Sequence, residues 1–197
     1  MKSACSEKYL ILASGSPRRH EILEAAGIPH KIQKTDADES LPDGISPEEA
    51  VELLSMRKAE SALQDAPENA LILAADTVVS LNGNILGKPK DADDARRMLK
   101  ELSGKKHTVF TGITISDGVK CITAHEKTVI FMRSLSPQEI DAYIHTGEPL
   151  DKAGAYGIQG RAGLFIRRLE GDYFNVVGLP LCLVGTILQK QFGFALL

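Results

Sequence analysis

The segment ALILAADTVVSLNGNIL, residues 70–86, decides the fold. Its apolar run reverses at Asn82-Gly83, a dipeptide that favours a two-residue hairpin turn between strands. Two or three further strands are expected between residues 107 and 132, with a turn at Asp117-Gly118. Helices and strands alternate earlier in the chain, whereas hairpins dominate the middle. The sequence therefore predicts an α/β fold with a mixed sheet flanked by helices.

One charged residue interrupts this apolar run. The apolar run continues on both sides of Asp76. Asp is depleted in strands, and a buried carboxylate is costly unless it is paired or used in catalysis. The alternative is an Asp at a strand end that bonds a turn. Because the run continues beyond Asp76, we favour a functional role.

The chain contains three expected helix starts of the type Ser-Pro, at Ser16, Ser46 and Ser136. At Ser46 and Ser136 a Glu follows three residues later, which predicts a capping box. At Ser16 the equivalent position is Arg19, with Arg18 beside it, where positive charge opposes the helix dipole. Together with the hydroxyls of Ser14 and Ser16, these arginines predict a phosphate site at the helix start. The alternative is that both point to solvent.

Outside these motifs the sequence predicts a strand at 9–13, helices at 46–64, 91–104 and 136–146, a Gly-rich loop at 146–163, a strand pair at 164–178 and a final helix at 179–191. On the helix expected at 46–64, Lys58 shares the apolar face, so its side chain must either extend to solvent or meet an anion.

Three further residues are candidates for the site. Lys88 is held in a Gly-Lys-Pro turn. Glu39 lies in an acidic loop and is a candidate Mg²⁺ ligand. Gln159 lies in the Gly-rich loop, which can approach a ligand closely.

Composition excludes several classes of protein. The 197-residue chain has a net charge of −3, three scattered cysteines and 5% aromatic residues. We therefore expect one domain, residues 1–197, in a reducing cytoplasm, without affinity for nucleic acid or membranes and without a signal peptide at residues 1–8. Basic groups, two carboxylates and no covalent nucleophile together indicate metal-assisted hydrolysis of a polyphosphate.

The motifs LASGSPRR, AADTVV, GKP and EPLDKAGAYGIQG occur in this order along nearly the whole chain. In type and spacing they resemble the Maf family of nucleoside triphosphate pyrophosphatases, also described as septum-formation inhibitors. The last motif resembles the branch that acts on dTTP and UTP. The resemblance implies an elongated, twisted mixed sheet with two lobes and a cleft between them. It also implies a homodimer and a role in nucleotide house-cleaning linked to cell division.

The resemblance also implies roles for individual residues. Asp76 would be the general base or a metal ligand, and Glu39 a second ligand of a divalent cation, Mg²⁺ or Mn²⁺. The triphosphate would be held by Arg18, Arg19, Lys58 and Lys88. Substrate choice would involve Arg18, Thr77 and Gln159.

Two alternatives stay open at this point. One is a pyrophosphatase for purine triphosphates of the inosine type. The other is a nucleotide-binding regulator of septum formation that does not hydrolyse its ligand. A nucleotide panel with product analysis separates all three.

Overall fold

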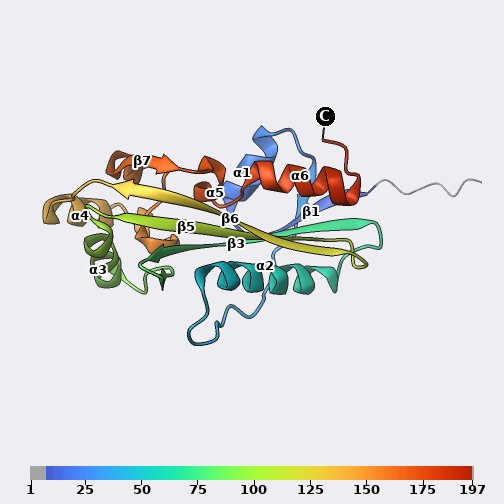
Figure 1. Cartoon of the computed structure of the whole chain (residues 1–197), viewed down its shortest axis with the longest axis horizontal. Coiled ribbons are helices and arrows are strands. Elements are labelled where there is room, and N and C mark those ends of the chain that lie inside the picture. Colours follow the sequence, from blue (N-terminus) through green and yellow to red (C-terminus); the bar gives the residue numbers. More distant parts are fainter. Residues whose placement is uncertain (1–7, 197) are drawn as a thin grey trace, which may run out of the picture.

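A twisted seven-stranded sheet runs the length of the molecule (Figure 1). The computed structural model describes residues 8–196, so the expectations on the first eight residues and on Cys5 lie almost wholly outside it. The strand order is β2-β1-β3-β5-β6-β7, with β4 also paired to β3. The strands are β1 Tyr9–Ala13, β2 His30–Ile32, β3 Ala70–Leu81, β4 Asn84–Leu86, β5 Lys106–Ser116, β6 Cys121–Met132 and β7 Ile166–Glu170. Because β1 pairs in parallel with both β2 and β3 while the other pairs are antiparallel, the sheet is mixed, as predicted.

The first half of the long strand β3, residues 70–75, is entirely apolar because it is covered on both faces. Ala70, Ile72 and Ala74 pack towards α2 (Pro47–Leu63) in one core cluster. Leu71 and Leu73 belong to a second cluster, which includes residues of α1 (Pro17–Ala25) and α6 (Leu181–Phe192). A strand buried on both faces reads as a continuous hydrophobic run. This alternation also decides that Asp76 and Thr77 point to opposite faces of the sheet.

Helix α2 approaches the sheet unusually closely at Gly112 on β5. A Cβ atom at this position would lie 2.2 Å from the Val51 carbonyl oxygen, so no larger residue fits without displacing the helix. In the strand register, Gly112 is the partner of Asp76. Gly112 therefore allows α2 to pack directly beside Asp76 of β3.

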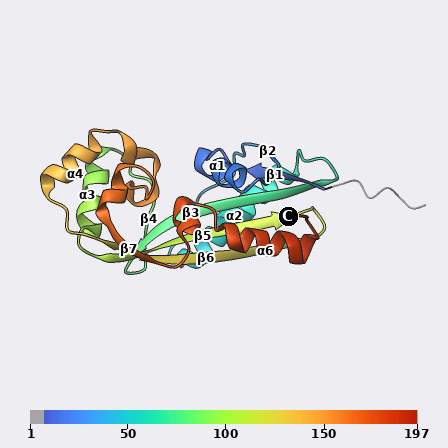
Figure 2. The same cartoon turned by 90° about the horizontal axis from the view of Figure 1, so that it is seen from above.

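The two lobes lie at opposite ends of the sheet (Figure 2). At one end, α1 and α6 share a core cluster with residues of β1, β3 and β5. At the other, α3 (Ala92–Leu102), α4 (Pro137–Ile144) and the Gly-rich segment form a third core cluster with Val79, Val109 and Ile130. The Gly-rich segment is folded into short 3-10 turns at Glu148–Asp151, Ala153–Ala155 and Arg161–Phe165. Strands β3 and β5 contribute side chains to the cores of both lobes.

Local sequence signals are confirmed at several turns and helix ends. Asn82 and Gly83 both have positive φ, 53° and 85°, as the hairpin requires. Ser46 and Ser136 form complete capping boxes, and Asp91 caps α3. The predicted strands between 107 and 132 are two long ones joined at Asp117-Gly118.

The predicted strand pair at 164–178 is wrong in its second half. Only β7 is a strand, and residues Tyr173–Val177 form a short helix, α5. The side chain of Asp172 accepts a hydrogen bond from Phe174 N, which starts the helix. Asn175, fully buried, donates from its amide to Val109 O and Thr128 Oγ1 and so fixes α5 on β5 and β6. Burial of this polar side chain overrides the β-propensity of the aromatic and valine residues around it.

Two further observations concern the surface. Within residues 8–196, no helix is long and apolar enough to cross a membrane. Of the three cysteines, Cys121 and Cys182 are exposed and free, whereas Cys5 is outside the described range.

Candidate active site

A cavity of about 590 Å³ opens where β1 ends but β3 continues. Ala13, the last residue of β1, pairs with Ala74, so the edge of β3 has lost its β1 neighbour when it reaches Asp76. Ligands of α/β proteins bind in such crevices, at the carboxyl ends of parallel strands. The structure brings every predicted site residue to this cavity. The residues are Ser14, Ser16, Arg18, Arg19, Glu39, Lys58, Asp76, Thr77, Lys88 and Gln159.

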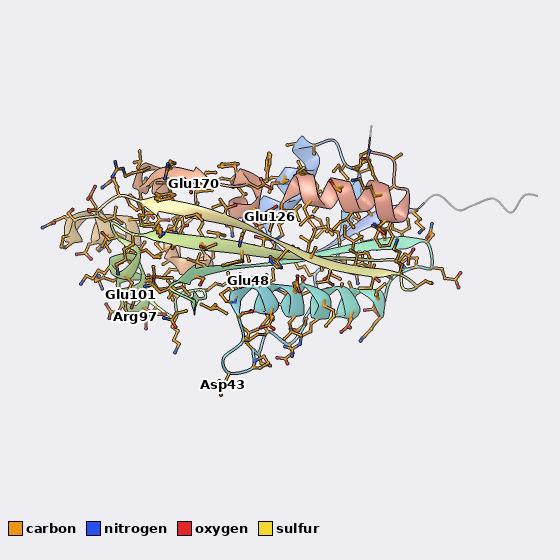
Figure 3. All side chains as sticks on the ribbon, in the orientation of Figure 1. Asp43, Glu48, Arg97, Glu101, Glu126 and Glu170 are labelled. Carbon is orange, nitrogen blue, oxygen red and sulfur yellow. The ribbon has the colours of Figure 1, made fainter. Side chains whose placement is uncertain are left out.

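On the face covered by α2, three charged side chains meet. Lys58 Nζ lies 2.5 Å from Asp76 Oδ1 and 2.7 Å from Glu39 Oε1. The side chains of Lys58 and Asp76 are each only 14% exposed, whereas Glu39 is 60% exposed. The hydrogen bond from Lys58 lowers the pKa of Glu39. Lys58 thus points inward from the apolar face of α2, as predicted, and meets anions there. Asp43, near the tip of the loop that carries Glu39, points away from the sheet (Figure 3).

On the opposite face of β3, Arg19 is held by neutral oxygens alone within residues 8–196. Its Nε donates to Gly178 O at 2.7 Å, and its two terminal nitrogens donate to Ser14 Oγ and Thr77 Oγ1, each at 3.1 Å. Burial lowers the pKa of Arg19, and the charge of Asp76 acts in the opposite direction. The guanidinium therefore lies in the cavity wall as a cation without a directly bonded carboxylate, so an anion in the cavity would be attracted to it.

The second arginine of the pair has a different environment. Arg18 Nη1 lies 3.3 Å from Asp151 Oδ2, on the 3-10 turn that belongs to the other lobe. Lys152 Nζ bonds the other oxygen of Asp151 at 2.6 Å and also Glu148 O at 2.6 Å. Although partial burial acts to raise it, the pKa of Asp151 is lowered, because Lys152 and Arg18 stabilise the carboxylate. This ion pair spans the cavity from one lobe to the other.

The start of α1 is left without a side-chain cap. Ser16 occupies the N-cap position, but its hydroxyl makes no capping hydrogen bond. Ser14 Oγ instead accepts from Ser16 N at 3.2 Å. No acidic residue lies in the first turn, in contrast to α2 and α4. Exposed backbone N–H groups at a helix start form an anion site, and this one faces the cavity.

The far part of the cavity is less polar. Its wall includes Val79, Val109, Ala153, Tyr156 and Val176. Gln159 is exposed at this cavity, on the Gly-rich segment. A planar heteroaromatic ring fits an apolar wall with a few hydrogen-bonding groups beside it.

The sequence did not predict several residues that line the cavity or bond its side chains. Asp151 and Lys152 line the cavity, but the motif that contains them was recognised without a role for either residue. Gly178 contributes a backbone carbonyl, which no sequence pattern reveals. Its position also depends on α5, which was predicted as a strand.

The two carboxylates fit a divalent cation. Asp76 Oδ1 and Glu39 Oε1 converge on one point, where Lys58 Nζ lies. Mg²⁺ is commonly held by one or two carboxylates together with substrate phosphates. Among residues 8–196 no cluster of three or more His, Cys, Asp or Glu side chains could hold a metal ion. The site therefore offers two protein ligands, and phosphate oxygens would have to supply more.

Comparisons with known proteins now define the class. The Maf-like protein family matches residues 9–191, and the chain belongs to this family. It is 49% identical over 192 residues to the dTTP/UTP pyrophosphatase of Pelotomaculum thermopropionicum, covering 96% of this chain and all of the relative. It is 52% identical over 174 residues to a protein of the same name from a Geobacillus strain, covering 88% and 93% of the two chains.

Two solved structures share the fold. The Staphylococcus aureus Ham1 protein superposes with a TM-score of 0.53 at 14% identity, covering 93% of this chain and 100% of that chain. Protein VC0702 of Vibrio cholerae gives 0.51 at 10% identity, covering 96% and 99%. At such identities the likeness concerns the fold alone.

Proposed function

We propose that this protein hydrolyses dTTP and UTP to the monophosphate and pyrophosphate. The relatives named for this activity align over nearly the full chain. The observation that carries the proposal is a cavity in which a carboxylate pair lies beside the half-buried Arg19 and an uncapped helix start. This arrangement offers binding groups for several phosphates and a proton acceptor. We further propose that the chain works as one domain, because β3 and β5 contribute to both cores.

In the proposed mechanism, the basic residues hold the phosphates. Arg19, the helix start and Arg18 would bind from one side, with Lys88 and Lys58 from the other. Such preorganised cations stabilise the charge that develops as pyrophosphate leaves. Asp76 would accept the proton of the water that attacks the α-phosphorus. Asp76 and Glu39 would hold a divalent cation, which when bound neutralises phosphate charge and acidifies water.

Base selection would occur at the less polar part of the cavity. The amide of Gln159 offers a donor and an acceptor, which match O4 and N3–H of uracil or thymine. Cytosine presents the inverse pattern, so it would leave groups unpaired at a cost of roughly 1–3 kcal/mol each. The homodimer, the cytoplasmic location and the link to cell division stay predictions.

A nucleotide panel tests the proposal. The protein is incubated with dTTP, UTP, CTP, GTP and ITP, with Mg²⁺ and with Mn²⁺, and the products are separated by chromatography. We expect the highest kcat/KM for dTTP and UTP, with pyrophosphate as the second product. Preferred hydrolysis of GTP or ITP would support the purine alternative instead. Orthophosphate as the first product would contradict the pyrophosphatase chemistry, and binding without turnover would support the regulator.

A further inference from the structure

A chain of hydroxyl groups leads from Arg19 into the interior of the protein. Arg19 donates to Thr77 Oγ1, which lies 2.9 Å from Thr111 Oγ1 on the neighbouring strand β5. Thr111 Oγ1 in turn lies 2.9 Å from Asn175 O on α5. Thr111 is fully buried and is not part of the cavity wall, so it cannot touch a ligand there.

The direction of every hydrogen bond in this chain is determined. A carbonyl oxygen only accepts, so the single proton of Thr111 points to Asn175 O. Thr111 must then accept from Thr77, whose own proton is thereby used. Thr77 consequently presents only lone pairs to Arg19.

This matters because, in the part of the chain that the structure describes, no carboxylate bonds Arg19 directly and orients it. Three neutral oxygens do so, and Thr77 Oγ1 is one of them. Helix α5 and its C-cap support this arrangement twice: Gly178 O accepts directly from Arg19, and Asn175 O accepts from Thr111. Without the Thr111 hydroxyl, the proton of Thr77 loses its acceptor, so the direction of the Thr77 lone pairs towards Arg19 is no longer fixed.

We propose that Thr111 is a positioning residue for Arg19 and sets the affinity of the cavity for polyphosphate through the orientation of Thr77. The kinetic consequence rests on the proposed function, whereas the binding consequence does not. Loss of one such acceptor corresponds to a change of about three- to tenfold in an equilibrium constant.

The experiment compares Thr111→Val with a matched control on the same strand. Thr114 is also fully buried, and its hydroxyl bonds Ser55 Oγ and Thr123 Oγ1 instead. Thr114→Val therefore reproduces the loss of a buried hydroxyl away from Arg19. Binding of inorganic tripolyphosphate is measured by calorimetry without added metal, and KM and kcat for dTTP are measured in parallel. Urea unfolding reports the stability of each variant.

We expect Thr111→Val to weaken tripolyphosphate binding about three- to tenfold and to raise KM more than it lowers kcat. Thr111→Ser should restore both, and Thr114→Val should leave both close to wild type at a similar loss of stability. In a Thr77→Val background, Thr111→Val should have no further effect on binding, because the residue through which it acts is gone.

Three results overturn the proposal. They are equal effects of Thr111→Val and Thr114→Val, an undiminished effect of Thr111→Val in the Thr77→Val background, and no tripolyphosphate binding by the wild-type protein. Absence of nucleotide hydrolysis with intact tripolyphosphate binding would contradict the proposed function instead, and the binding comparison would still decide the role of Thr111.

Discussion

Asp76 and Thr77 are neighbours on β3, yet they serve two different kinds of polar site. Asp76 faces α2 and takes part in an ion cluster in which Lys58 contacts two carboxylates. Thr77 faces the other way, where the described partners of Arg19 are all neutral oxygens. In the first site, two carboxylates bind the ammonium group of Lys58, and a metal ion could take its place. In the second site, Arg19 has no carboxylate partner among the described residues and can bind an anion. Because successive side chains of a strand point to opposite faces, the two polar sites lie on opposite faces of β3 at the same cavity.

The largest effect should come from the ion cluster. Asp76→Asn keeps the shape of the side chain and removes its charge. We expect kcat for dTTP to fall by about 10²-fold or more, the scale for losing a general base or preorganised group. The melting temperature should change little, because Lys58 keeps its ion pair with Glu39. Steady-state kinetics and thermal unfolding check this, with Asp65→Asn, in the exposed turn after α2, as the control.

Turnover near the wild-type rate in a folded Asp76→Asn protein would show that Asp76 has no catalytic role. The ion cluster would then not be the catalytic one of the two sites.

The second prediction concerns how α2 reaches Asp76. Gly112→Ala places a methyl group against the Val51 backbone, so α2 must move and Lys58 with it. Overpacking of this kind costs about 2 kcal/mol of unfolding free energy. Urea titration measures the loss, and kcat should fall with it. For the stability effect, Gly87→Ala is the control, because nothing lies within 4 Å of its added Cβ. A Gly112→Ala protein as stable as wild type would show that α2 is not seated by this contact.

The third prediction separates two arginines that are equivalent in the sequence. Arg19→Lys retains the charge but cannot reproduce three hydrogen bonds in fork geometry. We expect kcat/KM to fall about tenfold or more, as for loss of a hydrogen bond to a charged group. Arg18→Lys should cost at most about threefold, because Arg18 makes one 3.3 Å contact with an exposed carboxylate. Equal losses in both variants would contradict the distinction between the two.

The smallest effect is a change in a titration. Lys58 lowers the pKa of Glu39, so Lys58→Gln should raise that pKa towards its ordinary value. A depressed carboxyl pKa adds stability above the unfolded-state pKa, which is lost as the pH falls through the folded-state pKa. This contribution should shrink in the variant. Carbon NMR of the Glu39 carboxyl, assigned with Glu39→Gln, measures the change. Glu49, whose pKa is lowered by hydrogen bonds from Ser46, should titrate as before.

Much of the fold could be predicted because its signals are local. The hairpin at Asn82-Gly83 requires positive φ, and the capping boxes at Ser46 and Ser136 satisfy backbone donors within one turn. Helix α5 was missed because its stability comes from Asn175, whose partners are on β5 and β6. Its apolar residues suit a strand equally well, so propensity alone decided wrongly.

The sequence by itself determined which residues are out of place for folding alone: a carboxylate in a buried strand, an inward lysine and arginines at a helix start. Each violates a local rule of solvation or electrostatics, and such a violation is visible without coordinates. Only the tertiary structure decided what each one meets. That Arg19 bonds Gly178 O while Arg18 bonds Asp151, and that Thr111 orders Thr77, depends on contacts between residues far apart in the chain. Those contacts follow from the ending of β1, the approach of α2 at Gly112 and the docking of α5, none of which has a local signature.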